Sequence, residues 1–335
     1  MKKPKTKEKT AELLEETLRP KRMAQFLGQE KIKQKLEIFI QATQKRNEAL
    51  DHLLLYGPPG LGKTTLAHLI AQELGVNIRI TSGPSLERSG DLASILTNLK
   101  EHDILFIDEV HRLNKPVEEA LYPAMEEFCL DIVLGKGPSA RTVRLELPKF
   151  TIIAATTRIG LISSPMRDRF GAVFRMEFYS EEDLALIIDR SARILKVPTE
   201  KTVFLKLAKR SRGTPRIANR LLRRIRDFAQ IKGQGIINLN ILEEALEILE
   251  IDQMGLDKLD RDLLTALCLD HQGGPVGLDT LAATVSEDPG TIQDVVEPYL
   301  MQKGFLKRTK KGRMATPKAF KHLCLPMPKG QNALF

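Results

Sequence analysis

The sequence contains no tryptophan, four tyrosines, three cysteines and no apolar run of the ~18 residues that a membrane-spanning helix needs. The cysteines form no CxxC pair, which argues against a metal knuckle or a disulfide framework and favours a reducing cytoplasm; they are Cys129, Cys268 and Cys324. No apolar segment follows the basic N-terminus, so the sequence predicts a protein that is neither exported nor membrane-spanning. The scarcity of aromatic residues gives little support to base stacking on single-stranded nucleic acid.

Positive charge, by contrast, is in excess. There are 52 basic and 43 acidic residues, and the formal net charge of +9 favours an anionic partner such as nucleic acid. The chain has 335 residues, of which 42% are hydrophobic, so it can build ordinary cores and exceeds the size at which one core usually keeps growing. We therefore expect two or three domains.

The first large segment has the pattern of an α/β domain. Residues 1–17 are charged and weakly patterned, and we predict that they form a flexible leader. Over residues 18–179, short apolar runs alternate with amphipathic stretches such as 64–74; the runs are 52–56, 104–107 and 150–154. Strands that alternate with helices predict a parallel sheet flanked by helices.

The rest of the chain predicts two smaller domains. Residues 180–254 lose the strand pattern and show helical apolar spacing in four stretches, which predicts a small all-helical domain; the stretches are 181–195, 200–210, 215–231 and 240–249. Within residues 255–335, a helix at 278–285, a turn, a helix at 291–303 and two short strands over 305–316 predict a winged helix.

A phosphate-binding loop is predicted at Gly57–Thr64. The segment GPPGLGKT matches G-x-x-x-x-G-K-[ST] and lies between an apolar run and a helical stretch. Its glycines, Gly60 and Gly62 among them, let backbone N–H groups face phosphate oxygens, and the following helix presents its positive end. Lys63 is predicted to bind the β and γ phosphates of ATP, Thr64 to ligate Mg²⁺, and Thr65 to donate to the α phosphate.

A strand that ends in two carboxylates follows about 45 residues later. Asp108 is predicted to hold the magnesium shell, and Glu109 to act as the base that polarises the attacking water. The letters Asp-Glu-Val-His, ending at His111, also resemble the box of DExH helicases, whereas a helix-start histidine with a structural partner explains His111 equally well. The helicase alternative needs a second RecA-like domain, but only helices are predicted directly after Tyr179.

Three further polar features point to nucleotide sensing. The strand at 150–154 leads into hydroxyls and should lie beside the Asp108 strand, so either Thr156 or Thr157 is predicted to sense the γ phosphate or hold the water. The arginines of SPMRDRFG either pair with Asp168 or supply an arginine finger to a neighbouring subunit. Arg216 opposes the dipole at a helix start, which costs about 0.3 to 1 kcal/mol and which an anionic ligand would offset.

Two candidate hairpins carry no catalytic chemistry. Residues 130–147 alternate apolar and polar positions around Gly135-Lys-Gly-Pro138, which predicts an inserted hairpin whose apolar side chains need a cover. Near the C-terminus, six basic residues between Lys303 and Arg313 indicate duplex binding, with a solvated basic hairpin as the alternative. Arg308 and Arg313 are the predicted phosphate contacts, independent of base sequence.

The motifs together resemble one family. GPPGLGKTTLA, LFIDEVHRL, AATTR, SPMRDRFG and RGTPRIANRLLRR, in this order and spacing, resemble the AAA+ class of ATPases and, within it, the RuvB family of bacterial recombination. In the C-terminal segment GGPVGLDTLA, EPYLMQKGFLKRT and GRMAT resemble that family rather than AAA+ proteins in general. The similarity extends from Leu18 to about His322, nearly the whole chain.

The resemblance implies specific roles for the residues above. Lys63, Thr64, Asp108 and Glu109 would be the Walker sites of an AAA+ large domain at 18–179, and 180–254 its small lid domain. Thr157 or Thr156 would be the first sensor, Arg169 the trans-acting finger and Arg216 the second sensor. Base and ribose would be framed by Leu18, Arg19 and Tyr179. The subunit contact near a neighbour's nucleotide would be Glu126, Glu127 and Phe128, where Phe128 replaces the usual tyrosine; AATTR replaces the usual GATTR.

The resemblance also implies a function. The expected protein is a cytoplasmic ATP hydrolase, a homohexameric ring that pulls duplex DNA to drive branch migration of Holliday junctions in recombination, DNA repair and the SOS response. RuvA would dock on the 130–147 hairpin, and RuvC would join in a resolvasome. A clamp loader is disfavoured by the winged helix and the hairpin insertion. A non-motor, ATP-switched DNA-binding regulator is the alternative from another class.

Overall fold

The computed structural model describes residues 17–134 and 141–327. Within these ranges the chain forms two compact units, the first from residues 17–57 and 61–178 and the second from residues 58–60 and 179–327. The predicted leader lies outside the described residues except for Thr17. The predicted loop of the inserted hairpin, over 135–140, and the chain beyond residue 327 lie outside them as well.

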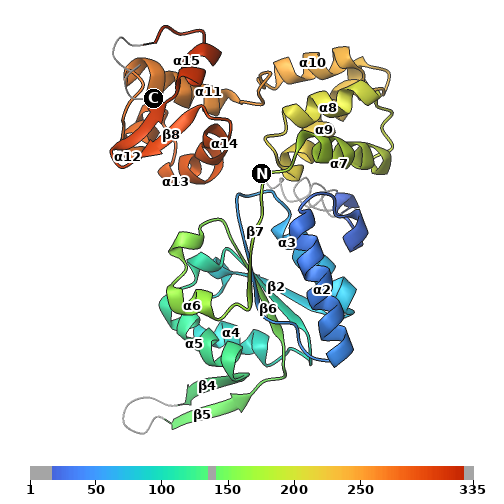
Figure 1. Ribbon diagram of the computed structural model, residues 1–335, viewed down its shortest axis with the longest axis vertical. Coiled ribbons are helices and arrows are strands. Elements are labelled where there is room, and N and C mark those ends of the chain that lie inside the picture. Colours follow the sequence, from blue (N-terminus) through green and yellow to red (C-terminus); the bar gives the residue numbers. More distant parts are fainter. Residues whose placement is uncertain (1–16, 135–140, 328–335) are drawn as a thin grey trace, which may run out of the picture. The chain divides into compact units, whose positions relative to one another are not determined.

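The first unit is built on a five-stranded sheet in the order β2-β3-β6-β1-β7 (Figure 1), and every strand pair in it is parallel. The strands are β1 (Leu53–Tyr56), β2 (Ile78–Ser82), β3 (Ile104–Asp108), β6 (Thr151–Thr156) and β7 (Ala172–Arg175). The three predicted apolar runs form β1, β3 and β6, and β6 pairs with both others. The two strands that sequence patterning missed, β2 and β7, are edge strands with partly exposed side chains, so neither has a continuous buried run.

Helices cover both faces of this sheet (Figure 1). On one face lie α2 (Glu30–Arg46) and α3 (Lys63–Leu74), and on the other α4 (Ser89–Leu96), α5 (Lys115–Glu126) and α6 (Ser164–Asp168). Alternate strand residues point to opposite faces, and Leu54, Leu105 and Ile152 join the core that includes α4 and α5 side chains. Single 3-10 turns connect these elements at η1 (Met23–Gln25), η2 (Gly83–Ser85), η3 (Val110–Arg112) and η5 (Ile159–Leu161).

The insertion between α5 and β6 is an antiparallel hairpin of β4 (Cys129–Leu134) and β5 (Arg141–Glu146) (Figure 1). Its base is anchored in the unit, because Leu130 and Leu147 are buried with 2% and 8% of their surface exposed. Val143, farther from the base, is 38% exposed. A hairpin was expected at this place.

The second unit begins with four helices that agree closely with the predicted ones: α7 (Glu181–Ile194), α8 (Lys201–Lys209), α9 (Pro215–Lys232) and α10 (Leu239–Ile248). Side chains of Ser180, Thr214 and Asn238 cap three of them by accepting from backbone N–H groups of the first turn. The spacing of apolar residues and the capping residues are both set by neighbours in the sequence, so these helices can be predicted without the tertiary structure.

The winged helix follows in the same unit. Its elements are α11 (Lys258–Thr265), a π-helical turn η6 (Ala266–Asp270), α12 (Leu278–Thr284), α13 (Pro289–Thr291), a π-helical turn η7 (Ile292–Val296), α14 (Glu297–Gln302), β8 (Leu306–Thr309), β9 (Gly312–Ala315) and α15 (Pro317–His322). The single helix predicted at 291–303 is therefore interrupted by a π-helical turn. Pro298, which has no N–H to donate, explains the interruption. Neither α11 nor α15 was predicted.

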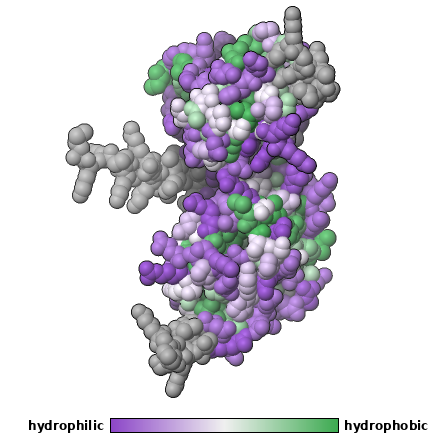
Figure 2. Space-filling model, turned by 90° about the vertical axis from the view of Figure 1, so that its left-hand side faces the viewer, coloured by the Kyte–Doolittle hydropathy of each residue, from purple (hydrophilic) through white to green (hydrophobic). Residues whose placement is uncertain are grey.

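On the face drawn in Figure 2, hydrophilic residues cover most of the surface, and hydrophobic residues appear in scattered patches. None of the helices in the described ranges is long and apolar enough to span a membrane.

Candidate functional site

The predicted phosphate loop connects β1 to α3 at the carboxyl edge of the sheet. Gly62 has a left-handed φ of 96° directly before the helix, a conformation that glycine adopts without strain. A Cβ on Gly57 would lie 2.5 Å from the Met176 carbonyl oxygen, so the loop has no room for a side chain there. Lys63 is buried, and its Nζ donates to the Gly57 carbonyl oxygen at 2.8 Å. The loop therefore holds its lysine inward, while Thr64 and Thr65 stay partly exposed on the first turn.

Sheet order brings the predicted acidic pair and the two predicted threonines to the same edge. Because the strands are parallel, their carboxyl ends meet there, and β6 lies between β1, which leads into the phosphate loop, and β3, which ends at Asp108. Tyr56 pairs with Thr156 in the sheet register. Ligands of open parallel sheets bind at such an edge.

Glu109 is held in an unusual backbone conformation. Its φ of 49° and ψ of 48° are left-handed, which costs a non-glycine residue on the order of 1 kcal/mol or more. Its N–H donates to Asp108 Oδ1 at 3.0 Å, and its carbonyl oxygen accepts from the Arg112 N–H at 2.9 Å. A Cβ added to Gly83 would lie 2.4 Å from that same carbonyl oxygen. The backbone around Glu109 is thus fixed from two sides, as expected of a preorganised site.

The Glu109 carboxylate is positioned by side chains from η3 and from the residue that directly follows β6. Thr157 Oγ1 donates to Glu109 Oε2 at 3.2 Å, and His111 Nδ1 lies 3.1 Å from the same oxygen. Thr156 is fully buried, with its Oγ1 2.9 Å from His111 Nδ1 and accepting from the Arg158 N–H at 3.0 Å. This arrangement favours Thr157 over Thr156 as the hydroxyl that faces the reaction, and it favours a structural partner role for His111 over the helicase-box alternative.

Arg169 is held by two side chains of α5 and a backbone carbonyl of α6. Its Nη2 donates to Glu126 Oε2 at 3.0 Å, its Nη1 donates to the Pro165 carbonyl oxygen at 2.7 Å, and its guanidinium carbon lies 4.2 Å from the centre of the Tyr122 ring. Arg169 therefore forms its ion pair with Glu126, and not with Asp168 as one of the two predictions had it. Two of the predicted subunit-contact features, Arg169 and Glu126, are therefore brought together. Tyr122, which packs under the guanidinium, was not predicted, because only the folded helix places it there.

The remaining predicted residues are dispersed. Glu127 forms an ion pair with Arg144, and the Phe128 ring meets Phe150 edge-on at 5.8 Å between centroids. Leu18 is buried at 3% exposure, and Arg19 is partly exposed in the same unit.

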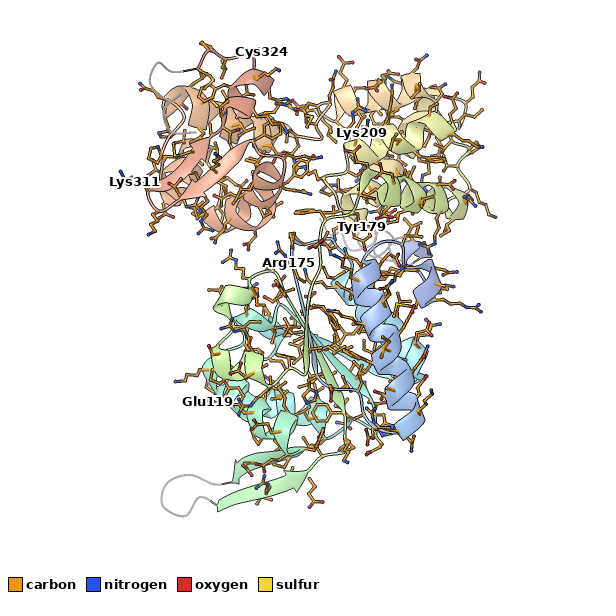
Figure 3. All side chains as sticks on the ribbon, viewed as in Figure 1. Glu119, Arg175, Tyr179, Lys209, Lys311 and Cys324 are labelled. Atoms are coloured by element: carbon orange, nitrogen blue, oxygen red, sulfur yellow. The ribbon has the colours of Figure 1, made fainter. Side chains whose placement is uncertain are left out.

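Tyr179 and Arg216 belong to the second unit. Tyr179, labelled in Figure 3, is buried. Its N–H donates to the Gly213 carbonyl oxygen at 2.9 Å. Arg216 is exposed on the first turn of α9, two residues after the capping residue Thr214.

The basic hairpin β8–β9 divides the two predicted DNA contacts. Arg308 is exposed, as are Lys307, Lys310 and Lys311, the last at the outer end of the hairpin (Figure 3). Arg313 is only 7% exposed, and its guanidinium forms an ion pair with Glu297, which is 2% exposed. The prediction for Arg313 therefore needs correction, because its charge is already neutralised inside the winged helix.

Gly83, which packs against the backbone of Glu109, was not predicted from the sequence. Gly83 directly follows β2, whose Ser82 pairs in register with Asp108 of β3. A strand predicted at 78–82 would have placed Gly83 beside the acidic turn. The mixed exposure of that edge strand hid the signal.

Comparisons with known proteins cover nearly the whole chain. Family models described as the Holliday junction DNA helicase RuvB P-loop domain, the RuvB AAA lid domain and the RuvB C-terminal winged helix domain match residues 18–176, 179–252 and 253–324. The solved structure of the Thermotoga maritima RuvB Holliday junction branch migration motor is 48% identical, covering 93% of this chain and 100% of that one with a TM-score of 0.86. A single-substitution variant of that protein is 49% identical, covering 92% of this chain and 100% of its own with a TM-score of 0.87.

Proposed function

This chain belongs to the RuvB family, and from that premise we propose that it forms a hexameric ring that pulls duplex DNA and thereby drives branch migration of Holliday junctions. As a member of this family it is a P-loop ATPase that acts as a Holliday junction helicase. In the proposed assembly ATP and Mg²⁺ bind between neighbouring subunits, and RuvA recruits the ring to the junction, where RuvC joins. The proposed compartment is the cytoplasm.

The residues of the nucleotide site fit ATP with Mg²⁺. Gly57 has no room for a side chain, and Gly60 and Gly62 have left-handed φ values of 82° and 96°, so backbone N–H groups of the loop can approach phosphate closely. Helix α3 directs its positive end at the same place. The Thr64 hydroxyl and the Asp108 carboxylate are hard oxygen donors of the kind that Mg²⁺ prefers. When bound, the metal would neutralise charge on the phosphates.

The geometry around Glu109 carries the proposal for hydrolysis. Glu109 accepts a hydrogen bond from Thr157 while His111 flanks the same oxygen, so one carboxylate oxygen is fixed and the other remains to orient a water. Lys63 would leave the Gly57 carbonyl to bind phosphate oxygens. In the neighbouring subunit's site, Arg169 would stabilise the charge that develops on the transferred phosphoryl group.

Two surfaces support the proposed partners. The β4–β5 hairpin exposes Asp131, Val143 and Arg144, and Val143, at 38% exposure, is an apolar side chain that needs a cover, so we assign RuvA to this hairpin. The exposed lysines of β8–β9 together with Arg308 would contact the phosphate backbone of duplex DNA. Such contacts carry no base sequence information, as a motor that moves along any sequence requires.

Substituting each hairpin arginine separates a DNA contact from a structural ion pair. Arg308→Ala is expected to lower the slope of log affinity against log salt concentration by about 1 for duplex DNA, with little change in the unfolding midpoint. Arg313→Ala is expected to destabilise the winged helix by about 3 to 5 kcal/mol, because it leaves Glu297 buried and unpaired. Salt titrations of DNA binding and thermal unfolding measure the two effects. A lowered salt slope for a well-folded Arg313→Ala protein would reverse the assignment.

The function itself is tested with a synthetic four-way junction. The full chain with RuvA is expected to dissociate the junction into duplexes with ATP and Mg²⁺, and to fail with a non-hydrolysable ATP analogue. Hydrolysis of ATP without any movement of the junction would refute the motor and favour a clamp loader or an ATP-switched DNA-binding regulator.

A further inference from the structure

A buried arginine lies directly before the turn that carries Arg216. Arg212 has a left-handed φ of 51° and a side chain that is 7% exposed. Its Nε donates to the Gly255 carbonyl oxygen at 3.0 Å, and its Nη2 lies 2.8 Å from Asp257 Oδ2 and contacts Asp260. An arginine of the helical domain is thus bound to the first turn of the winged helix, α11.

The two carboxylates also build the start of α11. Asp257 Oδ1 accepts from the Asp260 N–H at 3.1 Å, and Asp260 Oδ2 accepts from the Asp257 N–H at 2.9 Å, which is a reciprocal capping box. Asp260 is fully buried, and a buried charge requires a partner. Arg212 supplies it: its planar guanidinium donates hydrogen bonds to the Gly255 carbonyl oxygen and to Asp260 while it also pairs with Asp257.

The connection between the helical domain and α11 is held along its length. Asp252 Oδ1 accepts from the Met254 and Leu256 N–H groups, and its Oδ2 lies 2.7 Å from His322 Nε2. The Tyr299 hydroxyl donates to the Met254 carbonyl oxygen at 2.5 Å. A Cβ on Gly255 would lie 2.7 Å from the Arg210 carbonyl oxygen, so backbone packs on backbone. These contacts leave little freedom for a hinge at residues 252–257.

We propose that Arg212 is a positioning residue that couples the Gly213–Arg216 turn to the winged helix, so that a nucleotide-dependent movement of the turn is passed to the DNA-binding hairpin. The backbone that carries Arg216 continues directly from Arg212, and the guanidinium of Arg212 is locked to α11 at two carboxylates. A shift of the turn therefore moves α11 or breaks a buried ion pair. The coupling deepens the proposed function and rests on it, because it needs ATP to bind in this chain and Arg216 to be the second nucleotide sensor that the family resemblance implies.

Asp257→Asn tests the coupling with the least risk to folding. Arg212→Ala would leave Asp260 buried and unpaired and could unfold the protein for that reason alone. Asparagine at position 257 keeps an oxygen to cap α11, but it replaces the oxygen that faces Arg212 with an amide group. Circular dichroism and thermal unfolding would show that the variant is folded.

The chain offers a matched control two residues away. Arg210 is paired with Glu243 at 2.9 Å, with side chains 10% and 47% exposed, whereas the Arg212–Asp257 pair has 7% and 41%. Both members of the control pair belong to the helical domain, α8 and α10 with their flanks. Glu243→Gln therefore removes an equivalent charge without touching α11.

Two measurements on the full chain test the coupling. Hydrogen exchange of the α11 backbone amides is measured with and without a non-hydrolysable ATP analogue. Stimulation of ATP hydrolysis by duplex DNA is measured alongside, together with hydrolysis in the absence of DNA. We expect Asp257→Asn to lose the nucleotide-dependent change in α11 exchange and to reduce DNA stimulation by about five- to tenfold, with DNA-free hydrolysis unchanged. Glu243→Gln should behave as wild type in both.

The outcomes separate this coupling from the proposed function. Asp257→Asn matching Glu243→Gln in both readouts, or a wild-type protein whose α11 exchange ignores nucleotide, would overturn the coupling. Equal losses in both variants would overturn it too. Removing a carboxylate that does not contact α11 would then have the same effect as removing one that does. The opposite result is also possible: in the wild-type protein, nucleotide changes the α11 exchange but the four-way junction never moves. That result would refute the proposed motor function and leave the coupling in place.

Discussion

Replacing Arg169 with alanine is expected to lower kcat for ATP hydrolysis by about 10³-fold or more while ATP binding is retained. The guanidinium is fixed by Glu126, by the Pro165 carbonyl oxygen and by the Tyr122 ring, so its position is set before a neighbour arrives. A preorganised cation loses little entropy when it meets the developing charge of the transition state. Steady-state hydrolysis and binding of a fluorescent ATP analogue measure the two quantities.

Arg167→Ala is the matched control for this substitution. Arg167 lies two residues earlier on α6, and its Nη2 donates to Ser164 Oγ of the same helix at 3.1 Å. Its loss should leave kcat within a few-fold of wild type. Mixing Arg169→Ala subunits with Glu109→Gln subunits then tests action in trans, since an interface between the two kinds can combine an intact Arg169 with an intact Glu109. Activity that stays absent in every mixture, or an Arg167→Ala defect as large as that of Arg169→Ala, would contradict the assignment.

Replacing Glu109 with glutamine is expected to lower kcat by about 10² to 10⁴-fold, again with ATP binding retained. Glutamine keeps the size of the side chain and one oxygen to accept the Thr157 hydroxyl, but it cannot take a proton from water. Lys63 and the phosphate loop are untouched, so the nucleotide should remain bound unhydrolysed. Single-turnover hydrolysis of labelled ATP measures the chemical step directly.

Glu119→Gln provides the control, because it removes one carboxylate from the same domain. Glu119 is exposed on α5 (Figure 3), and its ion pair with Lys115 spans 3.8 Å. Exposed pairs of this kind contribute about 0 to 1 kcal/mol, so activity and stability should stay near wild type. A Glu109→Gln enzyme that turns over within about threefold of wild type would show that another group orients the water, since a general base contributes far more.

Much of the fold follows from local sequence signals. The three buried strands were visible because parallel strands covered on both faces need continuous apolar runs, and the four helices after Tyr179 were visible from their spacing. Edge strands β2 and β7 were missed because half of their surface needs no apolar side chain. The first helix of the winged helix, α11, was missed although its capping box is local in the sequence.

The nucleotide site was predictable for the same reason. Gly57 to Thr64 and the Asp108-Glu109 pair are contiguous motifs, in which neighbouring residues act on one ligand, so their spacing alone carries the chemistry. The resemblance of the motifs to one family agrees with the family models and with the solved structures of its members.

Tertiary structure alone decided which way individual side chains face. The sequence does not distinguish Thr156 from Thr157, yet Thr156 ends β6 buried against His111, whereas Thr157, directly after the strand, faces Glu109. Arg313 counts as one more positive charge in the sequence, but Glu297, 16 residues earlier, removes it from the surface. Arg212 and Asp260 are 48 residues apart and become partners only when the helical domain meets the winged helix. Burial and pairing depend on residues distant in the chain, whereas motif chemistry depends on residues adjacent in it.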